Sequence, residues 1–177
     1  DVATLTAKEK EALKKVRDGL PELTPDTVMQ KVIPVGDIQH YLSGKYTALR
    51  GFITRFEDVP HLTTYDDIYN GLRLEYPDSE FVPDVDDCMG VIRFKTEETS
   101  KIFTPYKEEM GGSSIGAPPF TGNGFTSAEN GRIIPEFKSD DFLEISDGAQ
   151  LIEISKDGTE KMLGIYSKED SKFISIE

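Results

Sequence analysis

The residues that could do chemistry fall in two short segments that lie far apart in the chain. The first, residues 47–52, reads Thr-Ala-Leu-Arg-Gly-Phe, so Arg50 stands directly before Gly51. The second, residues 122–128, reads Gly-Asn-Gly-Phe-Thr-Ser-Ala. A guanidinium stays charged, and its planar fork matches the paired oxygens of a diphosphate. Glycine lets the backbone approach a ligand closely. The two segments thus contain residue types that suit a phosphate-bearing ligand.

In this order the two segments resemble the first two of three motifs in the arginine-serine-glutamate class of ADP-ribosyltransferases. In that family a strand arginine followed by glycine contacts NAD phosphate, and a glycine-aromatic-hydroxyl stretch opens the strand that lines the nicotinamide pocket. The resemblance implies that NAD is a substrate and that Arg50 and Gly51 bind its phosphate. It assigns the pocket-lining role to four residues of the second segment: Gly124, Phe125, Thr126 and Ser127.

The third motif of that family supplies a catalytic glutamate at the start of a strand, before a Leu-Pro-x-Gly-like turn. Residues 142–148, Phe-Leu-Glu-Ile-Ser-Asp-Gly, resemble that turn and the residues after it, but Phe142 stands where the glutamate should be. The nearest carboxylates are Asp141, Glu144 and Glu136. Cleavage of the nicotinamide bond develops oxocarbenium charge at the ribose, which a fixed anion stabilises. These three carboxylates are therefore the candidate catalytic residues.

The resemblance implies a mono-ADP-ribosyltransferase that moves ADP-ribose from NAD to a protein acceptor. It also suggests a toxin or effector domain from a larger secreted bacterial protein, with a cognate immunity protein as a further partner. Two alternatives stay open. The same pocket would serve an NAD glycohydrolase, and the missing aligned glutamate favours a non-catalytic acidic protein that inhibits a basic toxin or enzyme.

Other reactive groups have plainer interpretations. Cys88 with His40 or His61 could form a nucleophile pair, but a small buried cysteine and two surface histidines explain the same residues. An acidic cluster could bind calcium, yet it lacks the glycine and the distal glutamate of an EF-hand loop and is expected to be a solvated turn: Asp84, Asp86 and Asp87. We predict no metal site. Phe120 and Phe125 flank a glycine-rich stretch and are expected to face a ligand.

The composition narrows the classes of function. Lys and Arg number 20 and Asp and Glu number 33, which gives a formal net charge of -13. This field repels nucleic-acid phosphates and anionic lipid surfaces, so neither is an expected partner. No apolar run approaches the ~20 residues needed to cross a bilayer. With one cysteine, an internal disulfide and a four-thiolate zinc site are both excluded.

Helix signals dominate the first part of the chain. Thr6 and Glu9 form a capping-box pattern before an apolar periodicity, which predicts a helix over residues 7–18. Thr24 and Pro25 suggest the cap and first turn of a second helix that continues to Val32. Two further helices are expected over residues 37–42 and 64–72.

Strand signals dominate the rest. We predict strands over residues 46–56, 89–95, 133–137, 150–155, 160–166 and 172–176. Asp157 and Gly158 supply a tight hairpin turn, and residues 111–124 form a glycine-rich loop. The sequence thus predicts one α+β domain over residues 1–177, with a helical segment at 1–44 and an α+β core at 45–177 whose second half is mainly antiparallel sheet. This order is the one that an ADP-ribosyltransferase-like fold implies.

Overall fold

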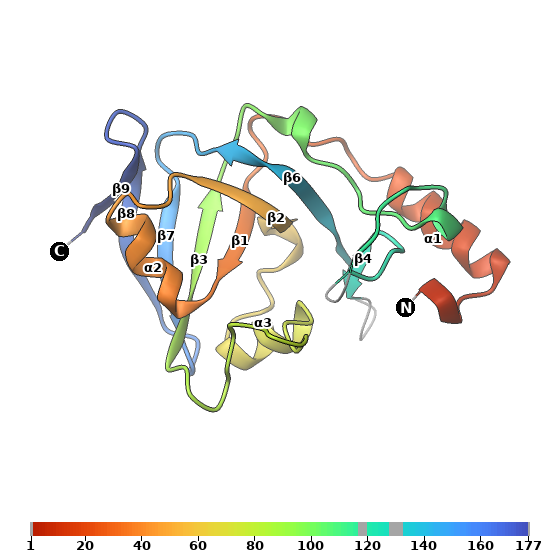
Figure 1. Ribbon diagram of the computed structural model, residues 1–177, viewed down its shortest axis with the longest axis horizontal. Coiled ribbons are helices and arrows are strands. Elements are labelled where there is room, and N and C mark those ends of the chain that lie inside the picture. The colour runs from red at the N-terminus through yellow and green to blue at the C-terminus, as the bar shows by residue number, and fades with distance from the viewer. Residues whose placement is uncertain (1, 117–119, 128–132, 177) are drawn as a thin grey trace.

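A computed structural model describes residues 2–116, 120–127 and 133–176 (Figure 1). Seven antiparallel strands form one curled sheet in the order β6-β2-β1-β3-β7-β8-β9. Their bounds are β1 Met29–Ile33, β2 Ala48–Arg55, β3 Cys88–Phe94, β6 Phe137–Glu144, β7 Gln150–Ser155, β8 Glu160–Ser167 and β9 Lys172–Ser175. A two-stranded sheet pairs β4 (Phe125–Ser127) with β5 (Ile134–Pro135).

The helices are few and short. They are α1 Ala7–Asp18, α2 Val35–Leu42 and α3 Tyr65–Gly71, with 3-10 turns η1 Val2–Thr4, η2 Phe56–Asp58, η3 Thr99–Lys101 and η4 Glu108–Met110. The chain is therefore mixed α and β. None of the helices in the described ranges has the length and apolar character of a membrane span.

The sheet separates between β1 and β2. β1 pairs with β3 at five positions but with β2 at only two, Met29 with Arg55 and Gln30 with Thr54. Beyond these pairs the strands diverge, and β2 continues along β6 with an irregularity between Leu49 and Gly51. In Figure 1, β2 and β6 run at a steep angle to β1, β3 and β7. This divergence leaves room for a groove between the two strands.

Each face of the sheet has its own core. β3 shows why, because side chains alternate along a strand: the fully buried Ile92 belongs to one cluster and Val91 to the other. α2 covers the first cluster with Ile38 and Tyr41. α3 covers the second with Tyr65 and Ile68, which are held over β3 and β7. Two short helices thus fix the sheet from opposite sides.

Three of the four expected helices are confirmed. In α1, Glu9 N donates to Thr6 Oγ1 over 3.2 Å and Thr6 N donates to Glu9 Oε2 over 2.8 Å, so the predicted capping box is present. α2 and α3 lie where helices were expected, over residues 37–42 and 64–72, and Thr64 caps α3 with Asp67.

The second expected helix is wrong. Thr24 and Thr27 close only a single turn, in which Thr27 N donates to the Thr24 carbonyl over 3.0 Å. The chain then extends into β1, which lies between β2 and β3 in the sheet. Pairing on both sides and the β-branched residues Val32 and Ile33 favour the extended form over the local cap signal. The first 44 residues therefore combine the helices α1 and α2 with a central strand, and a wholly helical segment is not confirmed.

Most expected strands are confirmed within a residue or two, and β7 matches at both ends. Gly158 has the positive φ, +90°, that the hairpin turn needs. The long strand β6 was not predicted. Residues 142–144, expected in a turn, form its end, and only two residues of the expected strand 133–137 form β5. Hydrophobic spacing is weak in β6 because polar residues occupy its middle, and pairing with β2 holds it extended.

Candidate functional site

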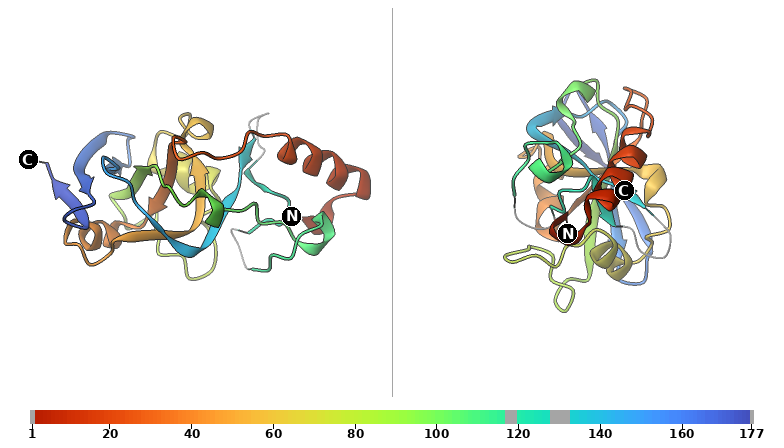
Figure 2. Two further views of the ribbon diagram at one scale, coloured as in Figure 1. Left: turned by 90° about the horizontal axis from the view of Figure 1, so that it is seen from above. Right: turned by 90° about the vertical axis from the view of Figure 1, so that its right-hand side faces the viewer.

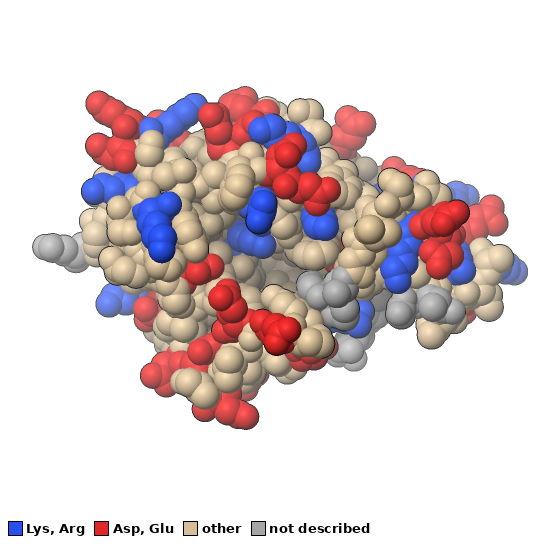
Figure 3. All heavy atoms as spheres, in the orientation of Figure 1, with Lys and Arg blue, Asp and Glu red and all other residues tan. Residues whose placement is uncertain are grey.

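A groove lies where β1 and β2 separate. It has an outer hollow of about 760 Å³ and an inner hollow of about 110 Å³. The two adjoin, since both are lined by Lys31, Val32, Tyr76 and Phe81. In the space-filling view of Figure 3, this face is hollowed near its middle, with basic side chains on one side and acidic side chains on the other. We refer to the outer and inner hollows together as the groove.

Basic side chains line the outer hollow. Lys31, Lys45 and Arg50 contribute to its wall, against the two acidic residues Asp37 and Glu80. The Arg50 guanidinium lies over the Phe142 ring, 4.8 Å from its centroid. Across the described part of the chain, no ion pair engages this guanidinium. Arg50 is exposed on β2 and lines the hollow, so its guanidinium is accessible to a ligand there.

Lys31 spans the gap between the diverging strands. Its Nζ donates to the Phe52 carbonyl over 3.0 Å, which satisfies a β2 carbonyl near the point where β1 leaves. Burial lowers the pKa of Lys31 to about 8. Gly51 makes room for this amine: its φ is +93°, and a Cβ there would lie 3.2 Å from Lys31 Nζ. Gly51 thus leaves space for the Lys31 amine, which is a structural role in addition to the phosphate-binding role expected from the sequence.

Two unsatisfied polar groups belong to residues that line the inner hollow. Glu136 is only 1% exposed; its Oε2 lies 3.5 Å from Thr121 Oγ1, while Oε1 has no hydrogen-bond partner within the described ranges. Thr54 Oγ1 is likewise buried and unpartnered there. Burial raises the pKa of Glu136 to about 7. Both groups therefore keep hydrogen-bonding capacity that a ligand in the inner hollow could use.

Arg17 of α1 fixes the backbone beside Glu136. Its Nε donates to the Gly124 carbonyl over 3.1 Å, and its Nη2 donates to the Glu136 carbonyl over 3.0 Å. The guanidinium also lies 4.3 Å from the Phe137 ring centroid. Gly124 has a φ of +88°, and a Cβ there would lie 2.8 Å from the Tyr106 ring. Only glycine therefore fits at this position.

Arg17 and Lys31 were not predicted from the sequence. One signal was available for Arg17, since it lies four residues after Leu13 and three before Leu20, on the apolar face of a helix. Lys31 gave no signal, because the segment around it was expected to be helical. Lys31 lies on β1, and the groove depends on this strand rather than on the expected helix.

The structure brings only some of the predicted site residues together. Arg50 lines the outer hollow, and Thr126 and Glu136 line the inner one. Asp141 and Glu144 are exposed on β6 and line neither hollow. Glu144 instead lies 3.9 Å from Lys168 Nζ. Glu136 is thus the candidate carboxylate that shares a groove with Arg50.

The remaining predicted residues have varied positions. Phe120 and Phe125 are buried, so they face the interior. The backbone of Ser127 pairs with Ile134 between β4 and β5. Ala128, the last residue of the second motif, lies outside the described residues, as does part of the glycine-rich loop, residues 117–119.

The acidic cluster, Cys88 and His40 line neither hollow of the groove. Asp86 accepts hydrogen bonds from Tyr65 Oη at 2.6 Å and from Val82 N at 2.9 Å, which closes the acidic turn. Cys88 is half-buried, and desolvation raises its pKa. The ring of His40 lies 4.8 Å from that of Tyr46. In the described ranges no group of three or more histidine, cysteine or acidic residues is placed to hold a metal ion.

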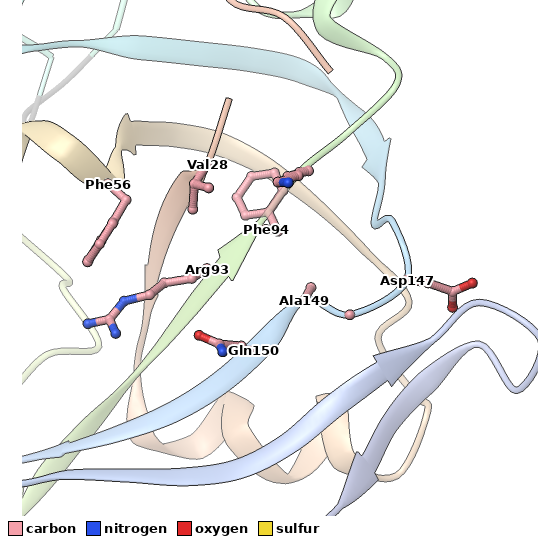
Figure 4. A pocket seen from close by; sticks show the side chains of 9 residues that line it. Val28, Phe56, Arg93, Phe94, Asp147, Ala149 and Gln150 are labelled. Carbon is pink, nitrogen blue, oxygen red and sulfur yellow. The ribbon is translucent and has the colours of Figure 1, made fainter. Parts of the chain in front are cut away.

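A separate hollow of about 370 Å³ contains a second arginine, Arg93 (Figure 4). Arg93 donates to Gln30 Oε1 over 3.0 Å, forms an ion pair with Glu160 and lies 4.5 Å from the Phe56 ring centroid. In Figure 4, Asp147 lies at the opposite end of this hollow. The Arg93 donors are engaged in holding strands together, whereas those of Arg50 face the groove.

Comparison of the chain with protein-family models, with curated protein sequences and with solved structures finds no match. Function must therefore be inferred from the geometry of the groove.

Proposed function

We propose that the groove binds NAD and that the chain is an ADP-ribosyltransferase-like enzyme. One observation carries the proposal: Arg50, Thr126 and Glu136, which are far apart in the sequence, line adjoining hollows of one groove. Arg50 is a cation suited to the diphosphate, and Glu136 is a carboxylate beside the small inner hollow. The resemblance of residues 47–52 and 122–128 to two family motifs gives the same assignment.

In the proposed reaction the bond between the ribose C1′ and the nicotinamide nitrogen breaks, and its electron pair leaves with nicotinamide. The ribose then carries oxocarbenium charge, which an ionised Glu136 stabilises. A nucleophile on a protein acceptor forms the new bond at C1′ and releases a proton. Because the pKa of Glu136 is raised to about 7, the rate should increase as pH rises through this value.

Release of nicotinamide from NAD tests the proposal. Arg50→Ala should lower kcat/KM by about tenfold or more, because a charge-assisted hydrogen bond to phosphate contributes about 1.5–3 kcal/mol. Arg50 is exposed, so its removal should leave the thermal unfolding temperature nearly unchanged. Lys161→Ala, on exposed β8 away from the groove, is the matched control. Equal turnover by wild type and Arg50→Ala would remove Arg50 from the mechanism.

Two other functions make different predictions in the same experiment. If water replaces the protein acceptor, the chain is an NAD glycohydrolase and free ADP-ribose accumulates. If the chain is a non-catalytic acidic inhibitor, as its net charge of -13 favours, NAD is neither cleaved nor bound. In that case the protein should respond only to a basic partner.

A further inference from the structure

We infer that Lys31 and Arg50 together form a diphosphate subsite at the point where β1 and β2 separate, with Lys31 as the second phosphate-binding group. The identity of the ligand as NAD rests on the proposed function. The subsite itself rests on the geometry of the groove, and it assigns a ligand-binding role to a residue that no sequence motif indicates.

Lys31 has the required position and donors. It lines both hollows, whereas Arg50, one residue before Gly51 on β2, lines the outer one. Its ammonium has three protons, of which the hydrogen bond to the Phe52 carbonyl uses one. Two donors remain for a phosphate oxygen. Lys31 is half-buried, and it borders both hollows from β1.

The local charge favours an anion although the whole chain does not. The chain carries 33 acidic and 20 basic residues, yet the outer hollow has three basic residues and two acidic ones. Charged and titratable groups line both hollows that Lys31 borders: Asp37 and Tyr41 of α2, Lys45 and Tyr46 after it, Arg50 of β2, Tyr76 and Glu80 after α3, and Glu136 between β5 and β6. Of these, Asp37 acts to keep the Lys31 amine protonated.

The subsite should show a distinctive pH dependence. Desolvation places the pKa of Lys31 at about 8, while a diphosphate diester keeps its two charges across the neutral and alkaline range. As pH rises through 8, Lys31 loses its proton and the subsite loses one of its cations. The affinity for the diester should therefore fall, whereas an arginine at position 31 would stay charged.

The test is calorimetric titration with ADP-ribose, which carries the diphosphate diester but has no nicotinamide bond to break. Wild-type affinity should fall by about tenfold between about pH 7 and about pH 9.5. Lys31→Met should bind about tenfold more weakly at neutral pH and lose the fall in affinity above about pH 8, whereas Lys31→Arg should bind but also lack that fall. Any change that the variants keep near pH 7 comes from ionisation of Glu136. Lys161→Met controls for the loss of one positive charge, and adenosine controls for contacts outside the diphosphate.

Two results would overturn the inference: wild-type affinity for ADP-ribose that does not change with pH, or binding by Lys31→Met as tight as wild type. Absence of ADP-ribose binding would also overturn it. Because wild type and Lys31→Arg are both informative, a failure of Lys31→Met to fold would not prevent the test. NAD cleavage is measured separately, so a Lys31-dependent site in a protein that leaves NAD intact would retain the inference and reject the proposed enzyme.

Discussion

At the scale of single residues, the burial of Glu136 disfavours the ionised carboxylate that the proposed reaction needs. Its carboxyl is almost fully buried, and one of its oxygens is unpartnered within the described ranges. The folded protein binds the Glu136 proton more tightly than the unfolded chain does, because burial raises the pKa to about 7 from the ordinary value near 4.5. The contribution of this group to stability is therefore greatest below pH 4.5 and is lost as pH rises to 7.

Glu136→Gln should remove the decrease in stability between pH 4.5 and pH 7, because an amide does not ionise. We expect the variant to match wild type near pH 4.5 and to exceed its free energy of unfolding at pH 8 by an amount on the order of 3 kcal/mol, as urea denaturation would measure. The same variant should lose NAD cleavage, because a neutral amide cannot stabilise the oxocarbenium charge. Parallel pH profiles of stability for the two proteins would contradict the proposed effect of burial on Glu136, whatever the activity.

At the scale of elements, α1 contacts the rest of the protein through the half-buried Leu13, through Asp18 and through one fully buried side chain, Arg17. Arg17 is the one residue of this helix that is buried, and it donates to two carbonyls that belong to Gly124 and Glu136. Arg17→Met keeps the apolar stem but leaves the Glu136 carbonyl without this donor. We expect a loss of about 1–3 kcal/mol in the free energy of unfolding, with faster amide exchange in α1 and around residue 136.

The control for Arg17 is Lys15→Met, an exposed change in the same helix that should be nearly neutral. Arg17→Lys should fall between the two, since an ammonium has no planar fork to reach both carbonyls. If Arg17→Met and Lys15→Met had equal stability and equal exchange, α1 would be held by its apolar contacts alone.

The elements also show how far sequence reasoning reaches. Local signals predict α1 and its capping box, because the bonds of a cap connect residues three apart. The turn at Gly158 results from its own backbone preference. β1 and β6 were not predicted because their extended form depends on strand partners far along the chain. For β1, a strong local cap signal at Thr24 also predicted a helix.

The candidate site divides in the same way. Arg50 could be named from its motif, and Glu136 was one of three carboxylates that the sequence could not separate. Only the fold shows that Glu136 lines the groove, whereas Asp141 and Glu144 are exposed on β6 outside it. Lys31 belongs to the strand that was mistaken for a helix, so its role required the fold.

At the scale of the whole molecule, the dominant fact is the net charge of -13. The molecule is elongated, with α1 near one end and the strands β8 and β9 at the other (Figures 1 and 2). Acidic side chains gather at several places on the face shown in Figure 3. Several of its ion pairs are solvent-exposed, such as Lys14 with Asp18, and such pairs contribute little. Repulsion among the excess acids should therefore outweigh them.

Added salt should consequently stabilise the protein. Raising sodium chloride from about 20 mM to about 0.5 M shortens the Debye length well below the size of the molecule and weakens the repulsion between acids. We expect the unfolding temperature at neutral pH to rise by about 3 °C, which corresponds to about 1 kcal/mol for a chain of this length. Potassium chloride at equal ionic strength should give the same shift, because screening does not depend on the cation. A lower unfolding temperature in salt would instead mean that attractive pairs, such as Arg55 with Asp58, outweigh the repulsion. The acidic surface would then stabilise the fold through those pairs rather than strain it.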